Sequence, residues 1–406
     1  MAQIADTAAT ARRREIAFAR LPDDARAHAG GAARLPALDA VALERWRALG
    51  GCAVEPNGYF LAEWELAVHA FSPGRTGARA LAAEGDAGAG LIGLLPVVSA
   101  WRAFRLPLPA LVSADPFGTL ATPLLDRDRA DSAADGLMRK ARAAGAHALV
   151  LRDIPLDGPA MAAFTRALGN DGLRPHVLYS QPRAWLDATR DADTVLREAL
   201  DAKKLKELRR QRNRLADHGE LVFAAATTPD DAARALEIFL ALEASGWKGR
   251  RGTALANNAG NAAFIRRAVR EGAARGSCEI VTLHAGAVPV AAAIVLRHLD
   301  RAFYFKMGVD ERFAKFSPGV QLTLDLTRRL CADDTVATAD SMAPANHPMI
   351  DPIWRGRFAI GDVLIPLRRR DPLVPAIRAA LDLRRRALGT ARRVVHGLRR
   401  LRNEHR

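Results

Sequence analysis

"YFKMGVDERFAKFSPGVQL", residues 304–322, is the stretch of the chain that decides its predicted fold. It begins as an aromatic, strand-like run, breaks at charged residues and restarts as a helix at Ser317-Pro318-Gly319. Ser317 suits the N-cap position, and Pro318 suits the first helical position, where a missing N–H costs nothing. Gly319 has no side chain to obstruct an approach from outside. The stretch therefore predicts a strand that is followed at once by a helix with an open first turn.

The first turn of this helix is a predicted anion site. The amides of Gly319, Val320 and Gln321 have no partner within the helix, and the helix dipole adds roughly half a positive charge there. An anion such as a diphosphate fits two or three parallel N–H donors. The alternative interpretation is a plain helix start, in which the Ser317 side chain accepts from the amide of Val320 and nothing binds.

Sequence periodicity orders the elements around this stretch. In the second half we predict a helix at 191–219, a strand at 220–226, helices at 229–246 and 261–276, strands at 278–284, 288–299 and 302–309, a helix at 318–334, and strands at 335–342 and 357–367. Very short turns predict that the three middle strands are antiparallel neighbours. In the first half we predict helices at 38–50, 60–71, 132–146 and 159–172, and strands at 90–101 and 147–154. These elements predict an α+β fold with a mixed, mostly antiparallel sheet flanked by helices.

Most of the chain's positive charge lies in its C-terminal tail. Residues 368–406 carry 13 Arg against three acidic residues, a net charge of +10 out of +15 for the whole chain. The apolar residues of this tail predict an amphipathic helix interrupted by Gly389 and Gly397; they are Ile377, Leu381, Leu388, Val395 and Leu398. Such a helix lies on an anionic membrane surface, binds nucleic acid or packs on its own domain. Because most of the charge lies in the tail and not over the rest of the chain, nucleic acid is the least favoured partner.

Composition excludes several classes of protein. Cys52, Cys278 and Cys331 are widely spaced, with no pattern typical of a disulfide framework or a metal site. No apolar run reaches the ~20 residues of a spanning helix, and the N-terminus lacks the apolar segment of a secretory signal. We therefore expect a cytoplasmic protein without a metal.

We expect four regions along the chain. Residues 1–36 have no period that would bury one face and are predicted to be disordered. Residues 37–190 form a first lobe, residues 191–367 a second lobe, and residues 368–406 the basic tail.

The order of elements in the second half, together with three short motifs, resembles the GNAT acyltransferase superfamily and in particular its CelD-like, cellulose-biosynthesis branch. The motifs are "GWKG" at 246–249, the stretch at 304–322 and "DSMAPANHP" at 340–348. The resemblance is good over about 190–367 and weaker over 37–190, where the family tends to carry a degenerate first lobe, as in the Fem aminoacyltransferases. One departure is that only Gly319 survives of the family's usual Gln/Arg-x-x-Gly-x-Gly/Ala phosphate loop.

The resemblance implies an acyl-CoA donor, such as acetyl-CoA, in a sheet that splays between the strands at 302–309 and 335–341. The CoA diphosphate would lie over the helix at 318, held at Ser317, Gly319, Val320 and Gln321. In this chemistry an amine or hydroxyl attacks the thioester directly, and no protein nucleophile is required. The amides of Met307, Gly308 and Val309 are the candidates for polarising the thioester carbonyl.

Three charged side chains are candidate catalytic residues. Glu311 and Asp340 follow or end strands that face the splay and could accept a proton or hold a cationic acceptor. Lys306 lies within the strand, where a buried ammonium is costly unless it is paired. The alternatives are a solvated turn at Glu311, a helix cap at Asp340 and an exposed strand face at Lys306.

Four further residues are candidate substrate contacts. Trp247 and Lys248 lie in a Gly-rich loop that is typical of a mobile cover, Tyr304 alternates with Lys306, and His347 could relay a proton. Their alternatives are structural, with Trp247 at a helix C-terminus and His347 in a turn before proline.

The sequence thus favours an acyl-CoA-dependent N- or O-acyltransferase acting on a sugar, a polysaccharide precursor or a small metabolite. Two alternatives stay open. One is a Fem-like aminoacyltransferase that uses aminoacyl-tRNA, and the other is a catalytically silent scaffold for exopolysaccharide synthesis, held at the inner membrane by the tail.

Overall fold

The computed structural model of the protein describes residues 34–86 and 90–404. Of the segment 1–36, which is predicted to be disordered, residues 1–33 lie outside the described residues. The described residues group into one compact unit, so the two predicted lobes are parts of a single body.

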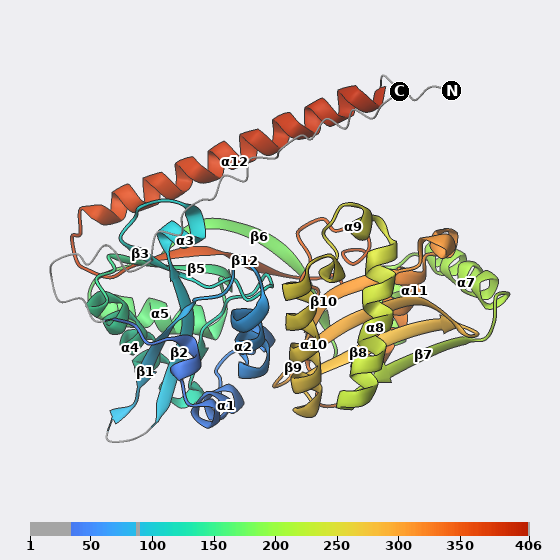
Figure 1. Ribbon diagram of the computed structural model, residues 1–406, viewed down its shortest axis with the longest axis horizontal. Coiled ribbons are helices and arrows are strands. Elements are labelled where there is room, and N and C mark those ends of the chain that lie inside the picture. Colours follow the sequence, from blue (N-terminus) through green and yellow to red (C-terminus); the bar gives the residue numbers. More distant parts are fainter. Residues whose placement is uncertain (1–33, 87–89, 405–406) are drawn as a thin grey trace, which may run out of the picture. The chain divides into compact units, whose positions relative to one another are not determined.

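One open, 12-stranded sheet runs through the described chain, with helices on both of its faces (Figure 1). In chain order the strands are β1 (Arg79–Glu84), β2 (Leu91–Ser99), β3 (Ala110–Ser113), β4 (Leu124–Leu125), β5 (Ala148–Pro155), β6 (His176–Asp187), β7 (Leu221–Ala226), β8 (Cys278–Ala285), β9 (Val288–His298), β10 (Arg301–Val309), β11 (Thr338–Asp340) and β12 (Gly356–Pro366). Their order across the sheet is β1-β2-β3-β5-β12-β6-β11-β10-β9-β8-β7, with β4 beside β2. Only the β3–β5 and β10–β11 pairs are parallel, which confirms the predicted fold class.

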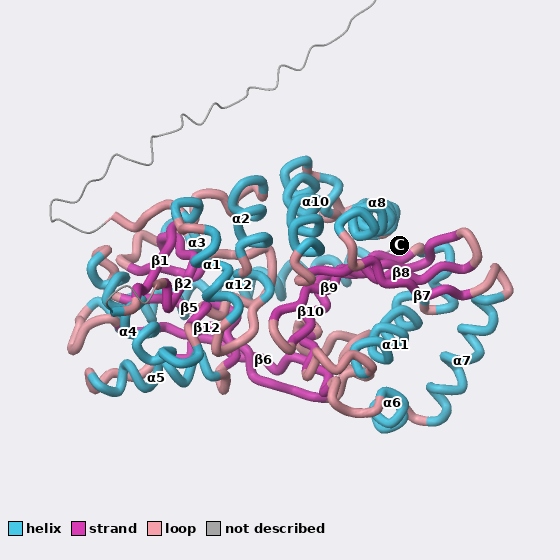
Figure 2. Tube along the Cα trace, turned by 90° about the horizontal axis from the view of Figure 1, so that it is seen from below, coloured by secondary structure: helices cyan, strands magenta, loops and turns pink. Residues whose placement is uncertain are grey.

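The helices are α1 (Leu43–Gly51), α2 (Ala62–Phe71), α3 (Ala100–Phe104), α4 (Ala130–Ala143), α5 (Pro159–Asn170), α6 (Ala192–Ala199), α7 (Ala202–Ala216), α8 (Pro229–Ser245), α9 (Trp247–Arg250), α10 (Ala259–Ala274), α11 (Pro318–Cys331) and α12 (Leu373–Glu404). In the second lobe α8 and α10 cover one face of β8–β10, and α11 covers the other (Figure 2).

The same order of elements occurs twice along the sheet. In the first lobe β1, β2 and β3 pair antiparallel, and α4 then leads to β5, which is parallel to β3. In the second lobe β8, β9 and β10 are followed by α11 and by β11, which is parallel to β10. Each lobe then sends its last strand into the other, because β6 pairs with β11 and β12 pairs with β5. The two lobes therefore share a continuous sheet across the boundary predicted near residue 190.

Two predictions about helices are wrong. The helix expected at 191–219 is two helices, because Leu200 is extended and the Asp201 side chain accepts from the amide of Lys204 at 2.6 Å, which starts α7 afresh. The tail helix expected to break at Gly389 is continuous as α12 from 373 to 404.

The first part of α12 packs one of its faces on the first lobe and leaves other apolar side chains exposed. Val374, Ile377 and Leu381 are buried in one cluster with residues of α3 and β3. Leu383 is 69% exposed and Leu388 is 44% exposed. No helix in the described part of the chain is long and apolar enough to span a bilayer.

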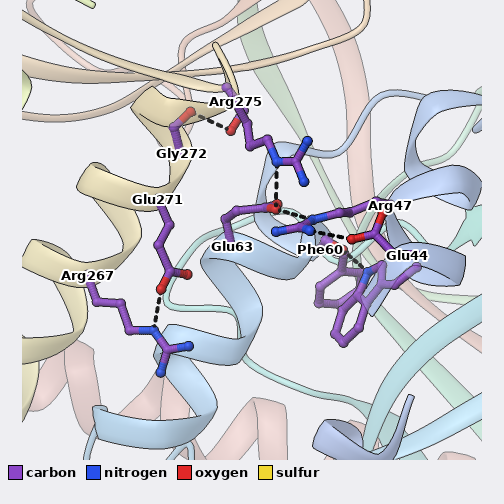
Figure 3. A network of polar contacts seen from close by, with 10 residues as sticks. Glu44, Arg47, Phe60, Glu63, Arg267, Glu271, Gly272 and Arg275 are labelled. Atoms are coloured by element: carbon purple, nitrogen blue, oxygen red, sulfur yellow. Dashed lines mark hydrogen bonds and ion pairs between the residues drawn. The ribbon is translucent and has the colours of Figure 1, made fainter. Parts of the chain in front are cut away.

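The two lobes also meet through α2 and α10. Trp64 of α2 and Phe264 of α10 form an edge-to-face pair at 5.2 Å within one buried cluster. At the rim of this contact Glu63 of α2 accepts from Arg47 Nε at 2.9 Å and lies 3.8 Å from Arg275, which follows α10 (Figure 3). This packing fixes the first lobe against the strands that carry the candidate site.

Strand β10 lies unusually close to a helix on each of its faces. A Cβ on Gly308 would lie 2.9 Å from the backbone nitrogen of Glu243 in α8. On the other face, a Cβ on Gly319 of α11 would lie 2.6 Å from Met307 Cε and 3.1 Å from Val309 Cγ1 of β10. The two glycines let both helices touch the same strand.

We expect Gly308→Ala to lower the free energy of unfolding by about 1–3 kcal/mol, because the new methyl group meets the α8 backbone, which cannot rotate away. The control is Gly169→Ala in α5, where nothing lies within 4 Å of the added Cβ. This control should leave stability unchanged or raise it by up to about 1 kcal/mol. Urea unfolding of the three proteins measures both effects, and equal stability of Gly308→Ala and the wild type would contradict the close packing.

Candidate functional site

The candidate site begins where β10 and β11 separate. The two strands pair only from Arg301 to Phe303 of β10, and β10 then continues to Val309 with β9 as its one neighbouring strand among the described residues. The pairing with β9 shifts register between Tyr304 and Lys306, which marks a bulge. The backbone therefore splays between these strands, as predicted, and leaves one edge of β10 without a neighbouring strand.

The free edge of β10 presents two of the three amides predicted to polarise a carbonyl. The amide of Asp310 donates to Val290 O of β9 at 2.9 Å. Because backbone groups alternate along a strand, Gly308 also faces β9, whereas Met307 and Val309 face the free edge. Gly308 thus serves the close packing of α8, and the other two amides are available to a ligand.

Side chains fill the space between the splayed strands. The hydroxyl of Tyr304 lies 3.1 Å from Thr323 Oγ1 and 3.3 Å from Met307 Sδ. Burial raises the pKa of Tyr304 to about 12. Trp354 is fully buried beside Tyr304, and its indole donates to Thr327 Oγ1 at 3.0 Å. The wedge that the sequence predicts is thus present in the backbone and closed by packing.

The first turn of α11 differs in detail from its prediction. Ser317 is the N-cap residue, but it has a left-handed backbone (φ 54°) and its side chain makes no capping bond, since the same residue also ends the preceding 3₁₀ helix, Glu311–Phe316. Its carbonyl accepts from the amide of Gln321 at 3.1 Å, and the Gln321 side chain donates to Leu208 O. The predicted set of three free amides is therefore reduced to those of Gly319 and Val320.

The prediction that Gly319 keeps the first turn open from outside is wrong. The direction that a side chain would take at Gly319 points at Met307 and Val309 of β10. Any ligand that reaches the turn along β10 has to move the Met307 side chain, which is unbranched and flexible.

Glu311 holds α9 against the end of β10. Its Oε1 accepts from the amide of Trp247 at 2.7 Å, and its Oε2 accepts from Arg250 at 2.7 Å. Arg250 and the Trp247 amide together lower the pKa of Glu311. This carboxylate positions the Trp247–Lys248 segment, which is a short helix rather than the predicted loop.

Lys306 and Lys248 converge on one buried carboxylate, that of Glu243 in α8. Glu243 Oε1 lies 3.4 Å from Lys306 Nζ and 3.3 Å from Lys248 Nζ, and Oε2 accepts from the amide of Leu255 at 2.8 Å. Lys248 also donates to the carbonyl of Met307 at 3.0 Å, on the free edge of β10. Burial lowers the pKa of Lys306, and the charge of Glu243 partly offsets this.

The first lobe completes the surroundings of Lys306. The ring of Phe117 lies 5.8 Å from Lys306 Nζ, and Arg75 lies 4.2 Å above the same ring. Arg75 forms an ion pair with Asp115 at 3.0 Å. Sequence reasoning missed this group and Glu243, although a charged residue at 243, on the same helical face as Phe239 and Leu242, was a signal of a buried partner.

Asp340 and His347 lie in structural positions on the β11 side. Asp340 is buried. Its carboxylate accepts hydrogen bonds from Arg183 Nη1 at 3.3 Å and from the amide of Met342 at 2.8 Å. It thereby links β11 to β6 and caps a turn, not the helix considered above. His347 Nδ1 lies 3.4 Å from the amides of Met349 and Ile350 and closes the next turn.

Residues 202–347 match the family model of the acetyltransferase (GNAT) domain. The matched segment contains all the predicted site residues. Among solved structures, FemX aligns with 83% of this chain and 98% of its own at 11% identity, with a TM-score of 0.55. A conserved protein of unknown function from Bacteroides thetaiotaomicron aligns with 82% of this chain and all of its own at 13% identity, with a TM-score of 0.50. At these identities the likeness shows a shared fold, and no curated protein matches the chain in sequence.

The segment that matches the family model does not include the whole site. Arg75, Asp115 and Phe117 belong to the first lobe, and Arg183, which holds Asp340, lies on β6. No group of three or more potential metal ligands occurs among the residues that the structure describes.

We expect Glu243→Gln to lower the free energy of unfolding by about 3–5 kcal/mol, because it leaves two lysines at a buried site without a carboxylate. Glu237→Gln, on the exposed face of the same helix, removes an ion pair with Arg266 and should cost at most about 1 kcal/mol. Chemical denaturation at pH 7 gives both values. Similar losses for the two variants would show that the Glu243 cluster contributes no more than a surface pair.

Proposed function

We propose that the chain transfers an acyl group from an acyl-CoA directly to an amine or a hydroxyl. The observation that carries this proposal is the free edge of β10, which lies against the first turn of α11. Both belong to the segment that matches the GNAT family model. The amides of Met307 and Val309 would polarise the thioester carbonyl, and those of Gly319 and Val320 would hold the diphosphate. Acetyl-CoA is the simplest such donor.

Lys306 is our candidate for the proton acceptor. Its pKa is lowered by burial, so its neutral form is more accessible than that of a surface lysine. Glu311 and Asp340 are each bound to an arginine and to a backbone amide. We therefore assign positioning roles to these two carboxylates, with Tyr304, Trp247 and His347 shaping the walls of the site.

A second candidate is a Fem-like aminoacyl transfer. The specific observations in its favour are the fold shared with FemX and the closed wedge over Gly319, where Pro318 removes one further donor. A silent scaffold is the third candidate, and the closed wedge is compatible with it too. The identity of the donor separates the three.

Calorimetry with acetyl-CoA, free CoA and longer acyl-CoAs tests the first proposal. We expect binding with a Kd of about 100 μM or tighter for at least one acyl-CoA. Lys306→Met should retain this binding and lose transfer, whereas the control Lys315→Met, which removes an exposed lysine, should retain both. If aminoacyl-tRNA binds and no acyl-CoA does, the result favours the Fem-like function. If no donor binds, the result favours the scaffold.

We also propose that α12 contacts an anionic membrane surface. The exposed Leu383 and Leu388 stand among arginines in a tail of net charge +10. The expected cytoplasmic location, peripheral at the inner membrane, follows from this contact and stays a prediction.

Vesicle flotation tests the membrane contact. The protein should float with vesicles that contain phosphatidylglycerol and not with phosphatidylcholine alone, and about 1 M salt should release it, because salt screens the charges. Leu383→Ser should weaken the binding, while Leu43→Ser, at an exposed leucine of α1, should not. Flotation that does not depend on lipid charge or on Leu383 would refute the proposal.

A further inference from the structure

A cavity lies at the start of β10, at the opposite end of the strand from the first turn of α11. Its volume is about 330 Å³, within the range of roughly 300–1,000 Å³ that is usual for ligand pockets. Both lobes line it. Its charged side chains are Glu55, Asp157, Arg301, Asp340 and Arg357, and its aromatic side chains are Trp185 and Phe358. It reaches none of the residues at 317–321.

Glu55 is a buried carboxyl on the wall of this cavity. Only 2% of the residue is exposed, and Oε2 accepts from the amide of Ala160 at 3.1 Å, at the start of α5. Its two oxygens lie 2.5 and 2.6 Å from the place of a Cβ on Gly158, so a side chain at 158 would have to displace the Glu55 carboxyl. Within the described residues Oε1 makes no hydrogen bond. Burial raises the pKa of Glu55 to about 7, against the opposing effects of the Ala160 amide and Arg301.

Arg301 is the positive group on the same cavity. Its Nε donates to Thr338 Oγ1 at 3.1 Å, which fixes the side chain across β10 and β11. Its two terminal nitrogens have no hydrogen bond or ion pair in the part of the chain that the structure describes. The charge of Arg301 lowers the pKa of Glu55, yet the two groups form no ion pair. A carboxyl and a guanidinium thus line one cavity with a gap between them.

The remaining charged groups of the cavity are already occupied or lie near solvent. Asp340 is bound by Arg183, and Arg357 donates to the carbonyls of Trp354, Gly356 and Asp351. Asp157 is exposed. The indole of Trp185 provides an apolar wall, and it lies directly over Gly356, which has no side chain.

We propose that this cavity binds a small α-amino acid, or the amino-acid end of a larger molecule, with its ammonium at Glu55 and its carboxylate at Arg301. A simple anion would meet the carboxyl of Glu55, and a simple cation would meet the guanidinium of Arg301, so a zwitterion matches both walls. Its side chain would lie against Trp185. The binding itself does not depend on acyl transfer; that the bound molecule is the acyl acceptor rests on the proposed function.

The test is calorimetry of the full chain with glycine, L-alanine, D-alanine, L-serine and L-lysine. At least one should bind with a Kd of about 1 mM or tighter. Its N-acetyl form, which lacks the ammonium, and its amide, which lacks the carboxylate, should each bind at least about tenfold more weakly. The charged groups that share the cavity with Glu55 are Arg301, Asp157, Asp340 and Arg357. Because Glu55 has to ionise to hold the ammonium, and burial raises its pKa to about 7, binding should strengthen from pH 6 to pH 8.

Two variants assign the ends of the ligand. Glu55→Gln should abolish the preference over the N-acetyl form and the pH dependence, and Arg301→Gln should abolish the preference over the amide. Arg190→Gln is the control, because Arg190 lines the neighbouring cavity with Glu198 and should leave both preferences intact.

Binding of no probe at about 10 mM, or binding that neither variant alters, would overturn the proposal. These outcomes are independent of the donor experiment. A chain that binds acyl-CoA but no amino acid keeps its proposed function and loses this pocket, and the reverse result removes the acyl-CoA donor and keeps the pocket.

Discussion

The contact of β10 with a helix on each of its faces is the constraint on which the rest of the site depends. Gly308 allows α8 to reach the strand, and this places Glu243 of α8 beneath Lys306. Gly319 allows α11 to reach the other face, and this places the first turn of α11 directly over Met307. Because the α8 backbone lies against Gly308, the bulge at 304–306 and the free edge beyond it have little room to shift toward α8. The site is therefore rigid at the strand and adaptable only where side chains meet.

The adaptable part of the site is rich in sulfur. Met307 lies over Gly319, and Met349 lies 4.0 Å from Thr323 on the inner face of α11. Methionine fills irregular space without fixing a single packing, so a wedge closed by methionine opens at a smaller cost than one closed by branched residues. Lys248, which occupies the carbonyl of Met307 on the free edge, comes from a short helix that is held largely by Glu311. Release of α9 from Glu311 would free the carbonyl of Met307 on the edge of β10 and would also loosen the Trp247–Lys248 segment.

The sequence predicts the local parts of this arrangement better than the long-range ones. Strands β8, β9 and β10 follow from periodicity and from turns too short to allow any other pairing. The exchange of β6 and β12 between the lobes does not follow, because pairing between strands far apart in the chain leaves no local period, and the first half of β6 is largely exposed. For the same reason Lys248 and Lys306 were recognised as candidates, but their common partner Glu243 was not. The carboxylates of Glu311 and Asp340 stand out in the sequence, but in the fold each accepts hydrogen bonds from an arginine and a backbone amide.

The exchanged strands also decide where a second site can exist. Without β6, β11 would be an edge strand of the second lobe, and without β12 no strand would join β5 to β6. The exchange brings the beginning of α5, and with it the carboxyl of Glu55, to the strand end that carries Arg301. Since Glu55 comes from one lobe and Arg301 from the other, neither lobe alone contains the cavity. Residues 202–347 supply the strand edge, the helix turn and the Arg301 wall of the cavity, and the first lobe supplies the opposite wall with Glu55.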